Sequence, residues 1–351
     1  MNLKELSSKL GLSQTTVSRA LNGYPEVSEQ TRARVLRAAE QHGYRPNTRA
    51  KGLATGQSMA IGHVIPVSTR HEIVNPIFGD FIAGAGEVYA RAGYEMVLTV
   101  VDDSNEAQVY RALRARAAVD GVVVHSPQIR EPRIALLTDI GLPFVVHGRS
   151  SDETAGYSWV DVDNRRAFVR ATTFLLDLGH RRIGLVNGLE TMDFAHRRRR
   201  GYEQGLAARG ITPDPALMRS GEMTEALGFE AARDMLAGPA PPTAFLAASI
   251  ISALGIRRAA EAAGLRVGRD LSIVTHDDEL SYLRNGGATP IFTATRSSVH
   301  TAGRLAAEML LQQIGGDVTS PRQILLEAEL VVGESTGPAP ALARMFDTAK
   351  D

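Results

Sequence analysis

The sequence predicts a chain of two parts: a small helical head with a helix-turn-helix, and a larger two-lobed α/β body with parallel sheets. In the first 60 residues, apolar side chains recur every three or four positions, which is typical of short amphipathic helices. After Gly56, short apolar runs alternate with amphipathic segments, as in parallel sheets covered by helices on both faces. The 351 residues, 44% of them apolar, are enough for two or three domains.

The head is predicted to hold three helices. Leucines at helical spacing begin at Leu3, and Gly11 ends this first helix. Ser13 is expected to cap a second helix over 14–21. A third helix is expected over 28–41, and two short helices braced by a third form a helix-turn-helix. Its inner face is expected to carry three apolar residues, Val35, Leu36 and Ala39.

The outer face of the second helix carries side chains suited to DNA. Gln14, Thr15 and Arg19 can form hydrogen bonds with phosphates or base edges, whereas a merely solvated face more often carries Glu and Lys. Residues 1–60 contain nine Lys or Arg and four Asp or Glu, a formal charge of +5 in a chain that is neutral overall. This asymmetry favours binding of a polyanion by the head, although a solvated basic surface is the alternative that charge leaves open.

The head resembles the signature of the LacI/GalR repressor family. The similarity runs without a gap through LKELSSKLGLSQTTVSRALN at 3–22 and on to GYRPN at 43–47. It implies that Gln14, Thr15 and Arg19 enter the major groove of double-stranded DNA. It places three further residues, Ser13, Ser18 and Asn22, near phosphates. A homodimer on a palindromic operator is also implied, because one head reads only a half-site.

The segment 46–58 resembles the hinge of that family. Pro46 can open a helix, but the segment is too short, and weakened by Gly52, to hold one alone in water. The resemblance implies that the hinge orders on DNA and that Leu53 is a wedge between base pairs. Asn47 and Ala50 are expected to contact DNA as well. A flexible linker is the alternative. The expected domains are 1–45, the hinge 46–58, the body 59–337 and a flexible tail 338–351.

The body is expected to form two α/β lobes, since its strands are too many for one sheet. The predicted strands are 61–67, 96–101, 121–125, 144–146, 159–162, 183–186, 245–248, 271–274 and 325–332. The predicted helices are 77–93, 105–118, 164–179, 197–210, 225–237, 252–264 and 298–314. Similarity to periplasmic sugar-binding proteins implies that the backbone crosses between the lobes near 158–163, 288–292 and 318–323.

A small-molecule effector is expected between the lobes, at the carboxyl ends of the strands. Asp277 follows a strand and is expected to point into this crevice, where its carboxylate suits a vicinal diol; capping of the next segment is the alternative. The family resemblance implies that Arg198 reaches the ligand, beside Asp277. It also implies that Phe78 lines the pocket, with ordinary core packing as the alternative. Further candidates for effector contacts are Ser126, His147, Ser249 and His276.

Several classes of protein are disfavoured. Cysteine is absent, so disulfides and thiolate sites are excluded, and the nine histidines show no metal spacing. No phosphate loop or nucleophile motif is found, so we expect no enzyme and no cofactor. Without a signal-like or membrane-spanning apolar stretch, the expectation is a soluble cytoplasmic protein that binds no membrane.

The sequence therefore favours a DNA-binding regulator, acting as a repressor that responds to a sugar or glycoside. The direct alternative is a regulator that responds to a purine or another metabolite. A pure solute-binding protein is opposed by the complete helix-turn-helix head. An α/β enzyme with an accessory DNA-binding domain is opposed by the missing catalytic motifs.

Overall fold

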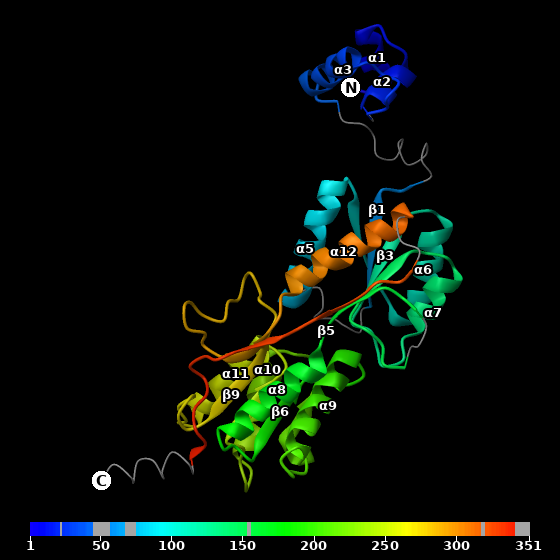
Figure 1. The fold of residues 1–351 in the computed structure, drawn as a ribbon. Helices are drawn as coiled ribbons and strands as arrows, with labels where there is room; N and C mark the ends of the chain where they lie inside the picture. The colour runs from blue at the N-terminus through cyan, green and yellow to red at the C-terminus, as the bar shows by residue number, and fades with distance from the viewer. Residues whose placement is uncertain (22, 45–56, 67–74, 153–155, 317–319, 341–351) are drawn as a thin grey trace.

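The computed structural model describes residues 1–21, 23–44, 57–66, 75–152, 156–316 and 320–340 (Figure 1). Most of the expected hinge and tail therefore lies outside the described residues. The same holds for four residues expected to contact DNA, namely Asn22, Asn47, Ala50 and Leu53. None of the described helices combines the length and the apolar character that a membrane crossing requires.

The head forms the three predicted helices, α1 (Leu3–Leu10), α2 (Gln14–Leu21) and α3 (Glu29–Gln41). Ser13 caps α2 as expected, because its hydroxyl accepts a hydrogen bond from the Thr16 amide at 3.0 Å. Leu6, Val17 and Val35 are fully buried at the centre of the head. The expectation that Leu36 faces inward is wrong: it is 48% exposed, since one residue after Val35 the helix has turned by about 100°.

The first lobe of the body is a six-stranded sheet in the order β11-β5-β4-β3-β1-β2. All its strands are parallel; they are β1 (Ala60–Pro66), β2 (Glu95–Val101), β3 (Gly121–His125), β4 (Phe144–His147), β5 (Trp159–Val162) and β11 (Gln323–Leu326). One face is covered by α5 (Pro76–Ala92) and α12 (Val299–Gly315), the other by α6 (Glu106–Ala115) and α7 (Pro132–Asp139) (Figure 1). Buried valines alternate between the faces: Val123 packs with α5 and α12, and Val122 with α6 and α7.

The second lobe repeats this plan with the strand order β12-β10-β9-β8-β6-β7. Its strands are β6 (Ile183–Asn187), β7 (Met218–Ser220), β8 (Ala244–Ala247), β9 (Ser272–Asp277), β10 (Thr293–Arg296) and β12 (Glu329–Val331), of which only β12 is antiparallel to its neighbour. The helices pack in pairs, α8 (Asn164–Asp177) with α9 (Asp193–Ala207) and α10 (Glu225–Leu236) with α11 (Ile250–Ala262). Two α/β lobes with parallel sheets are confirmed.

The chain crosses between the lobes three times, and two of these crossings lie later than expected. The first follows β5, as predicted. The second was expected near 288–292, but β10 still belongs to the second sheet, so the chain crosses only after Arg296. The third was expected near 318–323, but β11 belongs to the first sheet, and the crossing lies between Leu326 and Glu329.

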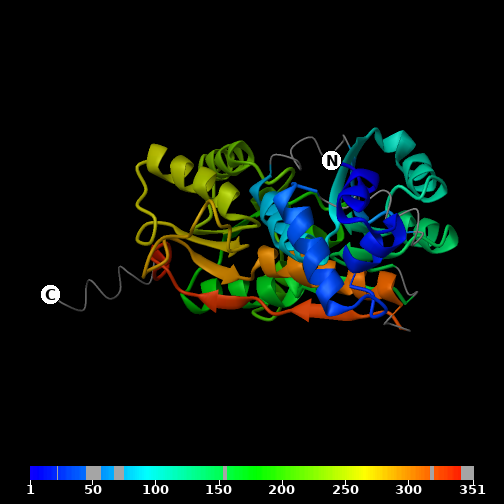
Figure 2. The same ribbon diagram turned by 90° about the horizontal axis from the view of Figure 1, so that it is seen from above.

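The single strand predicted over 325–332 is therefore two strands. β11 pairs with β5 in the first lobe and β12 with β10 in the second. Figures 1 and 2 show this red and orange ribbon running along both lobes. An unbroken apolar pattern cannot show where a chain leaves one sheet for another. Three further elements, β7, β10 and α7, were not predicted, because they are short and have weak periodicity.

Candidate functional site

The exposed face of α2 is the candidate site for DNA. Gln14, Thr15 and Arg19 are exposed, while Val17 and Ala20 are buried against the rest of the head. These outward residues recur at the spacing of one helix face, as predicted. Ser18 is half-buried beside them. Ser13 is exposed, but its hydroxyl already caps the helix and contacts the Thr16 hydroxyl at 2.8 Å.

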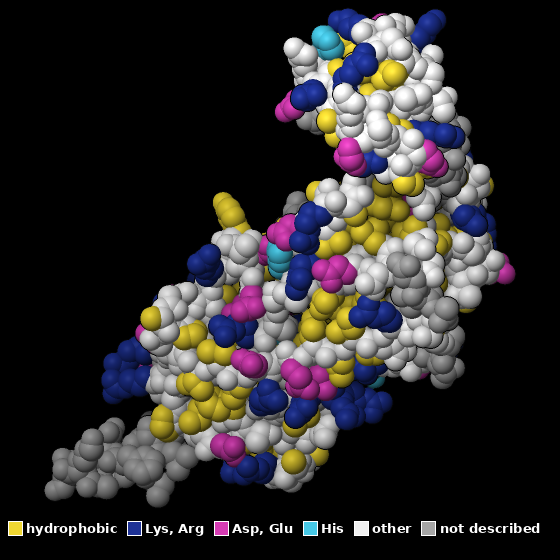
Figure 3. Space-filling model, turned by 45° about the horizontal axis from the view of Figure 1, so that its top comes forward, with side chains coloured by type: hydrophobic (Ala, Val, Ile, Leu, Met, Phe, Trp, Pro, Cys, Tyr) yellow, Lys and Arg dark blue, Asp and Glu magenta, His cyan; other side chains and the backbone are white. Residues whose placement is uncertain are grey.

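The arginines of the head divide into two groups. Arg32 donates to the carbonyls of Gly23 and Tyr24, at 3.2 and 2.9 Å, and Arg34 donates to the Leu10 carbonyl. Both guanidinium groups therefore brace the turns between the helices. Arg19 makes no ion pair with the described residues. Figure 3 shows several Lys and Arg side chains on the visible surface of the head.

A cleft between the two lobes of the body is the candidate site for a small molecule. Its walls come from both lobes, at the carboxyl ends of the strands, as in other open α/β folds. From the first lobe it is lined by Asn75, Ile77, Phe78, His125, Ser126, Pro127, His147, Gly148, Val299 and Ala302. From β5, the second lobe and the crossings that follow β5 and β10, it is lined by Asp161, Val162, Asn164, Phe194, Arg198, Met223, His276, Asp278 and Ser297.

Arg198 is the central cation of the cleft. It lies on α9 and is only 5% exposed. Its Nε donates to Asn164 Oδ1 at 2.7 Å and its Nη1 to the Ala248 carbonyl at 2.6 Å. Its guanidinium also lies 5.0 Å from the centre of the Phe194 ring. Burial lowers the pKa of Arg198 to about 10, so it remains charged at neutral pH. These partners hold the Arg198 side chain in the wall of the cleft, where it was expected.

The carboxylate that faces the cleft is Asp278, and the expected orientation of Asp277 is wrong. Successive residues of an extended strand point to opposite sides, so Asp278 shares the side of His276. Both line the cleft, and Asp278 Oδ1 lies 3.5 Å from His276 Nε2. Asp277 instead lines another hollow, where its carboxylate accepts from the Glu279 amide at 2.9 Å. The alternative role, in which Asp277 caps the following turn, fits this geometry.

Asp278 has an oxygen available for a ligand. Its Oδ2 is buried and has no hydrogen-bond partner in the described structure. Burial alone would raise the pKa of Asp278, but the neighbouring His276 and Arg198 hold that pKa below its ordinary value. Asp278 is therefore a carboxylate at neutral pH. A buried acceptor without a partner is costly, so this oxygen is suited to a donor from a bound molecule.

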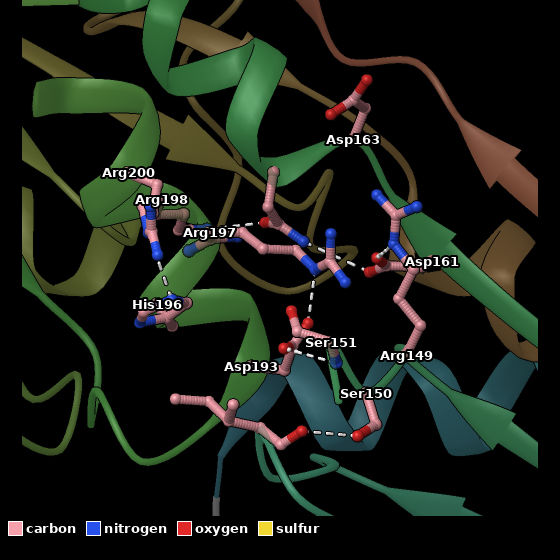
Figure 4. Close-up of polar contacts among 12 residues, drawn as sticks. Arg149, Ser150, Ser151, Asp161, Asp163, Asp193, His196, Arg197, Arg198 and Arg200 are labelled. Carbon is pink, nitrogen blue, oxygen red and sulfur yellow. Dashed lines mark hydrogen bonds and ion pairs between the residues drawn. The ribbon is translucent and has the colours of Figure 1, made fainter. Parts of the chain in front are cut away.

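A second carboxylate, Asp161, extends the polar wall. Arg149 donates to Asp161 at 2.8 Å (Figure 4), and Asn164 Nδ2 donates to its other oxygen at 3.2 Å. Asn164 in turn accepts from Arg198, so one continuous polar chain joins Arg149 to Arg198. Burial raises the pKa of Asp161 to about 6, with Arg149 opposing this shift. Asp161 was not among the predicted site residues, because it belongs to a predicted strand and no sequence feature marks it as lining a site.

The histidines of the cleft are neutral. Burial lowers the pKa of His147 to about 4. Burial also lowers the pKa of His125, to well below its ordinary value. His125 Nε2 lies 2.9 Å from Nδ1 of the fully buried His63. His276 contacts the Thr295 hydroxyl at 3.1 Å, and burial lowers its pKa too. Neutral imidazoles both donate and accept, which suits hydroxyl groups.

The seven predicted effector residues divide into two groups. Five of them line the cleft, namely Phe78, Ser126, His147, Arg198 and His276. Besides Asp277, only Ser249 does not: it is fully buried and caps α11 through the Ser252 amide at 3.2 Å. Its position after a strand is what suggested the cleft, but the same position starts a helix. The described residues contain no cluster of side chains that could hold a metal ion.

Comparisons with known proteins agree with both halves of this description. Residues 2–47 match the model of bacterial regulatory proteins of the lacI family, and residues 172–336 match a periplasmic binding protein-like domain. The chain is 45% identical over 341 residues to the HTH-type transcriptional regulator AglR of Rhizobium meliloti (strain 1021), covering 97% of this chain and 95% of that protein. It is 31% identical to the regulator CelR of Thermobifida fusca, covering 95% and 97%.

Two solved structures share the whole architecture. A complex of the regulator CelR with cellobiose has a TM-score of 0.71 and 29% identity, covering 95% of this chain and 99% of that one. The lac repressor dimer bound to operator and the anti-inducer ONPF has a TM-score of 0.81 and 25% identity, covering 96% and 99%.

Proposed function

Because this chain belongs to the lacI family of bacterial regulatory proteins, we propose that it is a homodimeric repressor controlled by a sugar or glycoside. Members of this family are DNA-binding transcriptional regulators rather than enzymes. The proposal extends to a palindromic operator as the DNA partner, to a cytoplasmic location beside that DNA, and to the cleft between the lobes as the effector site.

One observation supports a hydroxylated effector above all. The buried Arg198 lies among the carboxylates Asp161 and Asp278, and an oxygen of Asp278 has no hydrogen-bond partner among the described residues. Sugars present adjacent hydroxyls that donate to carboxylates and accept from guanidinium groups. One similar regulator supports the same proposal, since CelR was solved with cellobiose.

The DNA contacts are assigned to the head and the hinge. We assign Gln14, Thr15 and Arg19 to base edges, and Ser13, Ser18 and Asn22 to phosphates. For the hinge we keep the expected contacts of Asn47 and Ala50 and the wedge Leu53, although these lie outside the described residues. The effector contacts are Phe78, Ser126, His147, Arg198 and His276, with Asp278 in place of Asp277; Ser249 is left out because it does not line the cleft.

Two assays on the full-length protein test this proposal. In the first, random duplex DNA is selected on the protein, and we expect a palindrome with two half-sites about one helical turn apart or a multiple of it. In the second, sugars, glycosides and nucleosides are screened by thermal shift. A ligand at 100 times its dissociation constant adds about 2.7 kcal/mol to the free energy of unfolding. Enrichment of no palindrome refutes the operator, and stabilisation by nucleosides alone refutes the sugar.

A further inference from the structure

A second hollow adjoins the effector cleft on the same side of the molecule. We call the cleft described above the inner chamber and its neighbour the outer chamber. The two share four lining residues, Asn75, Ser126, Phe194 and Met223. The outer chamber is further lined by Pro76, Gly188, Leu189, Met192, Gly221, Glu222, Thr224, Glu225 and Ile251. The shared residues place the two chambers side by side.

The chambers differ in chemistry. The inner chamber holds the buried charges Asp161, Arg198 and Asp278, together with neutral histidines. The outer chamber exposes mainly aliphatic and thioether surface, from Leu189, Met192 and Ile251. Such a surface suits the carbon–hydrogen faces of a ligand more than its hydroxyl groups.

Two polar side chains of the outer chamber are already engaged. The Thr224 hydroxyl accepts from the Leu227 amide at 3.1 Å and so caps α10. Glu225 pairs with Arg258 at 3.0 Å. These groups therefore stabilise the second lobe, and they add little to the recognition of hydroxyls.

Phe194 lines both chambers. It lies in the first turn of α9, and the Arg198 guanidinium lies 5.0 Å from the centre of its ring. Gly188 leaves room for this ring, because a Cβ atom there would lie 2.9 Å from Phe194 Cζ. An aromatic ring between a polar and an apolar chamber offers a surface on which the linkage between two rings can lie.

We propose that the natural effector consists of two joined rings: a sugar ring in the inner chamber, and a second sugar or aglycone in the outer chamber. The inference rests on the proposed function, since it takes the inner ring to be a sugar. A free monosaccharide fills only the inner chamber and leaves the apolar surface of Leu189, Met192 and Ile251 in water. Covering that surface adds affinity that only the longer ligand gains.

The first test is calorimetry on the full-length protein with free sugars and disaccharides. The probes are the free sugars glucose and galactose and the disaccharides maltose, cellobiose, melibiose and lactose. Together, the four disaccharides present each sugar at the non-reducing end in both the α and the β linkage. We expect at least one disaccharide to bind about tenfold or more tightly than the free sugar that forms its non-reducing end. Equal affinity of a free sugar and all four disaccharides overturns this inference and leaves the proposed function intact. Binding of none of the six overturns both.

The second test locates the added affinity. Leu189 is 38% exposed and lines the outer chamber, while Leu325 is 41% exposed on β11 and lines neither chamber. We expect the double variant Leu189→Ala and Met192→Ala to weaken the best disaccharide far more than its free sugar. Leu325→Ala is the matched control and should change neither affinity. An equal loss for both ligands in the double variant contradicts the outer subsite.

Discussion

At the scale of single residues, the effector site depends on which of two adjacent carboxylates faces the cleft. Asp278 lines it beside His276, and Asp277 is turned to the opposite side, where it holds the Glu279 amide. Asp278→Asn should weaken effector binding by about 100-fold, because a charge-assisted hydrogen bond inside the cleft is lost. Asp277→Asn is the matched control one residue away and should weaken it less than about fivefold. Calorimetry on both variants checks this, and the reverse order would restore Asp277 as the ligand contact.

DNA recognition at this scale rests on Arg19. Arg19→Ala should cost about 1–3 kcal/mol of operator binding if its guanidinium contacts a base, and the head should stay folded because the side chain is exposed. Arg37→Ala removes the same charge from α3 and is the matched control, expected to lose only the small non-specific part. Anisotropy titrations with the selected palindrome measure both. Equal losses would mean that Arg19 contributes charge alone.

The buried histidines make stability depend on pH. His63 is fully buried, and burial lowers its pKa to about 3, against about 6.5 in the unfolded chain. The unfolded chain therefore takes up a proton below pH 6.5 that the folded chain refuses. Each such histidine costs about 1.4 kcal/mol per pH unit as the pH falls from about 6 toward 4.

His63→Phe should make this acid dependence shallower by about one proton between pH 6 and 5, as measured by urea unfolding at each pH. Asp161 acts in the opposite sense: with its pKa raised to about 6, it takes up a proton in the folded state first and offsets part of the loss. The comparison of variant and wild type cancels that contribution. An unchanged slope for His63→Phe would show that His63 is charged in the fold.

At the scale of elements, the start of α9 ties the lobes together. The Asp193 amide donates to the Pro127 carbonyl at 2.9 Å, and its carboxylate accepts from the Ser151 amide at 3.0 Å (Figure 4). The Ile129 amide also donates to the Thr191 carbonyl at 3.3 Å. These hydrogen bonds join segments of the first lobe to the second lobe beside the cleft. They are additional to the three places where the backbone itself crosses between the lobes. They hold the two walls of the site in contact.

Asp193→Ala should therefore loosen the contact between the lobes and speed effector dissociation about tenfold, since it removes the carboxylate that accepts from the Ser151 amide. Stopped-flow displacement of a bound disaccharide measures the rate. Asp177→Ala is the control, because it breaks an exposed pair with Arg209 in the same lobe, and exposed pairs contribute little. Identical dissociation rates in both variants would mean that the Asp193 contact does not govern closure.

The sequence predicts long elements well and short ones poorly. The three helices of the head, with Ser13 as a cap, follow from apolar spacing and side-chain capping that act within a few residues. The paired edge strands β11 and β12 cannot be separated this way, because their division is decided by which sheet each one meets. The same holds for the cleft. His147 and His276 could be predicted because each lies at the end of a strand. Which of Asp277 and Asp278 faces the cleft depends on how far side chains continue to alternate between the two faces of the sheet.

At the scale of the whole molecule, one chain carries two sites. The head carries the exposed face of α2, and the body carries the cleft, with 46–58 between them. An effector can change DNA affinity only if it binds one arrangement of the lobes more tightly than another. The three crossings and the Asp193 contacts are the parts of the body that such a change must move.

The most direct test of this coupling is a titration of the selected palindrome, labelled for fluorescence anisotropy, with the full-length protein. It is run without effector and with the best sugar from the screen at saturation. We predict that the sugar changes the dissociation constant for DNA by at least about fivefold in the wild type. Asp278→Asn should bind DNA as the wild type does without sugar and should show no response to the sugar concentration that saturates the wild type. A wild-type titration that is identical with and without bound sugar would contradict the central claim that the cleft controls the head.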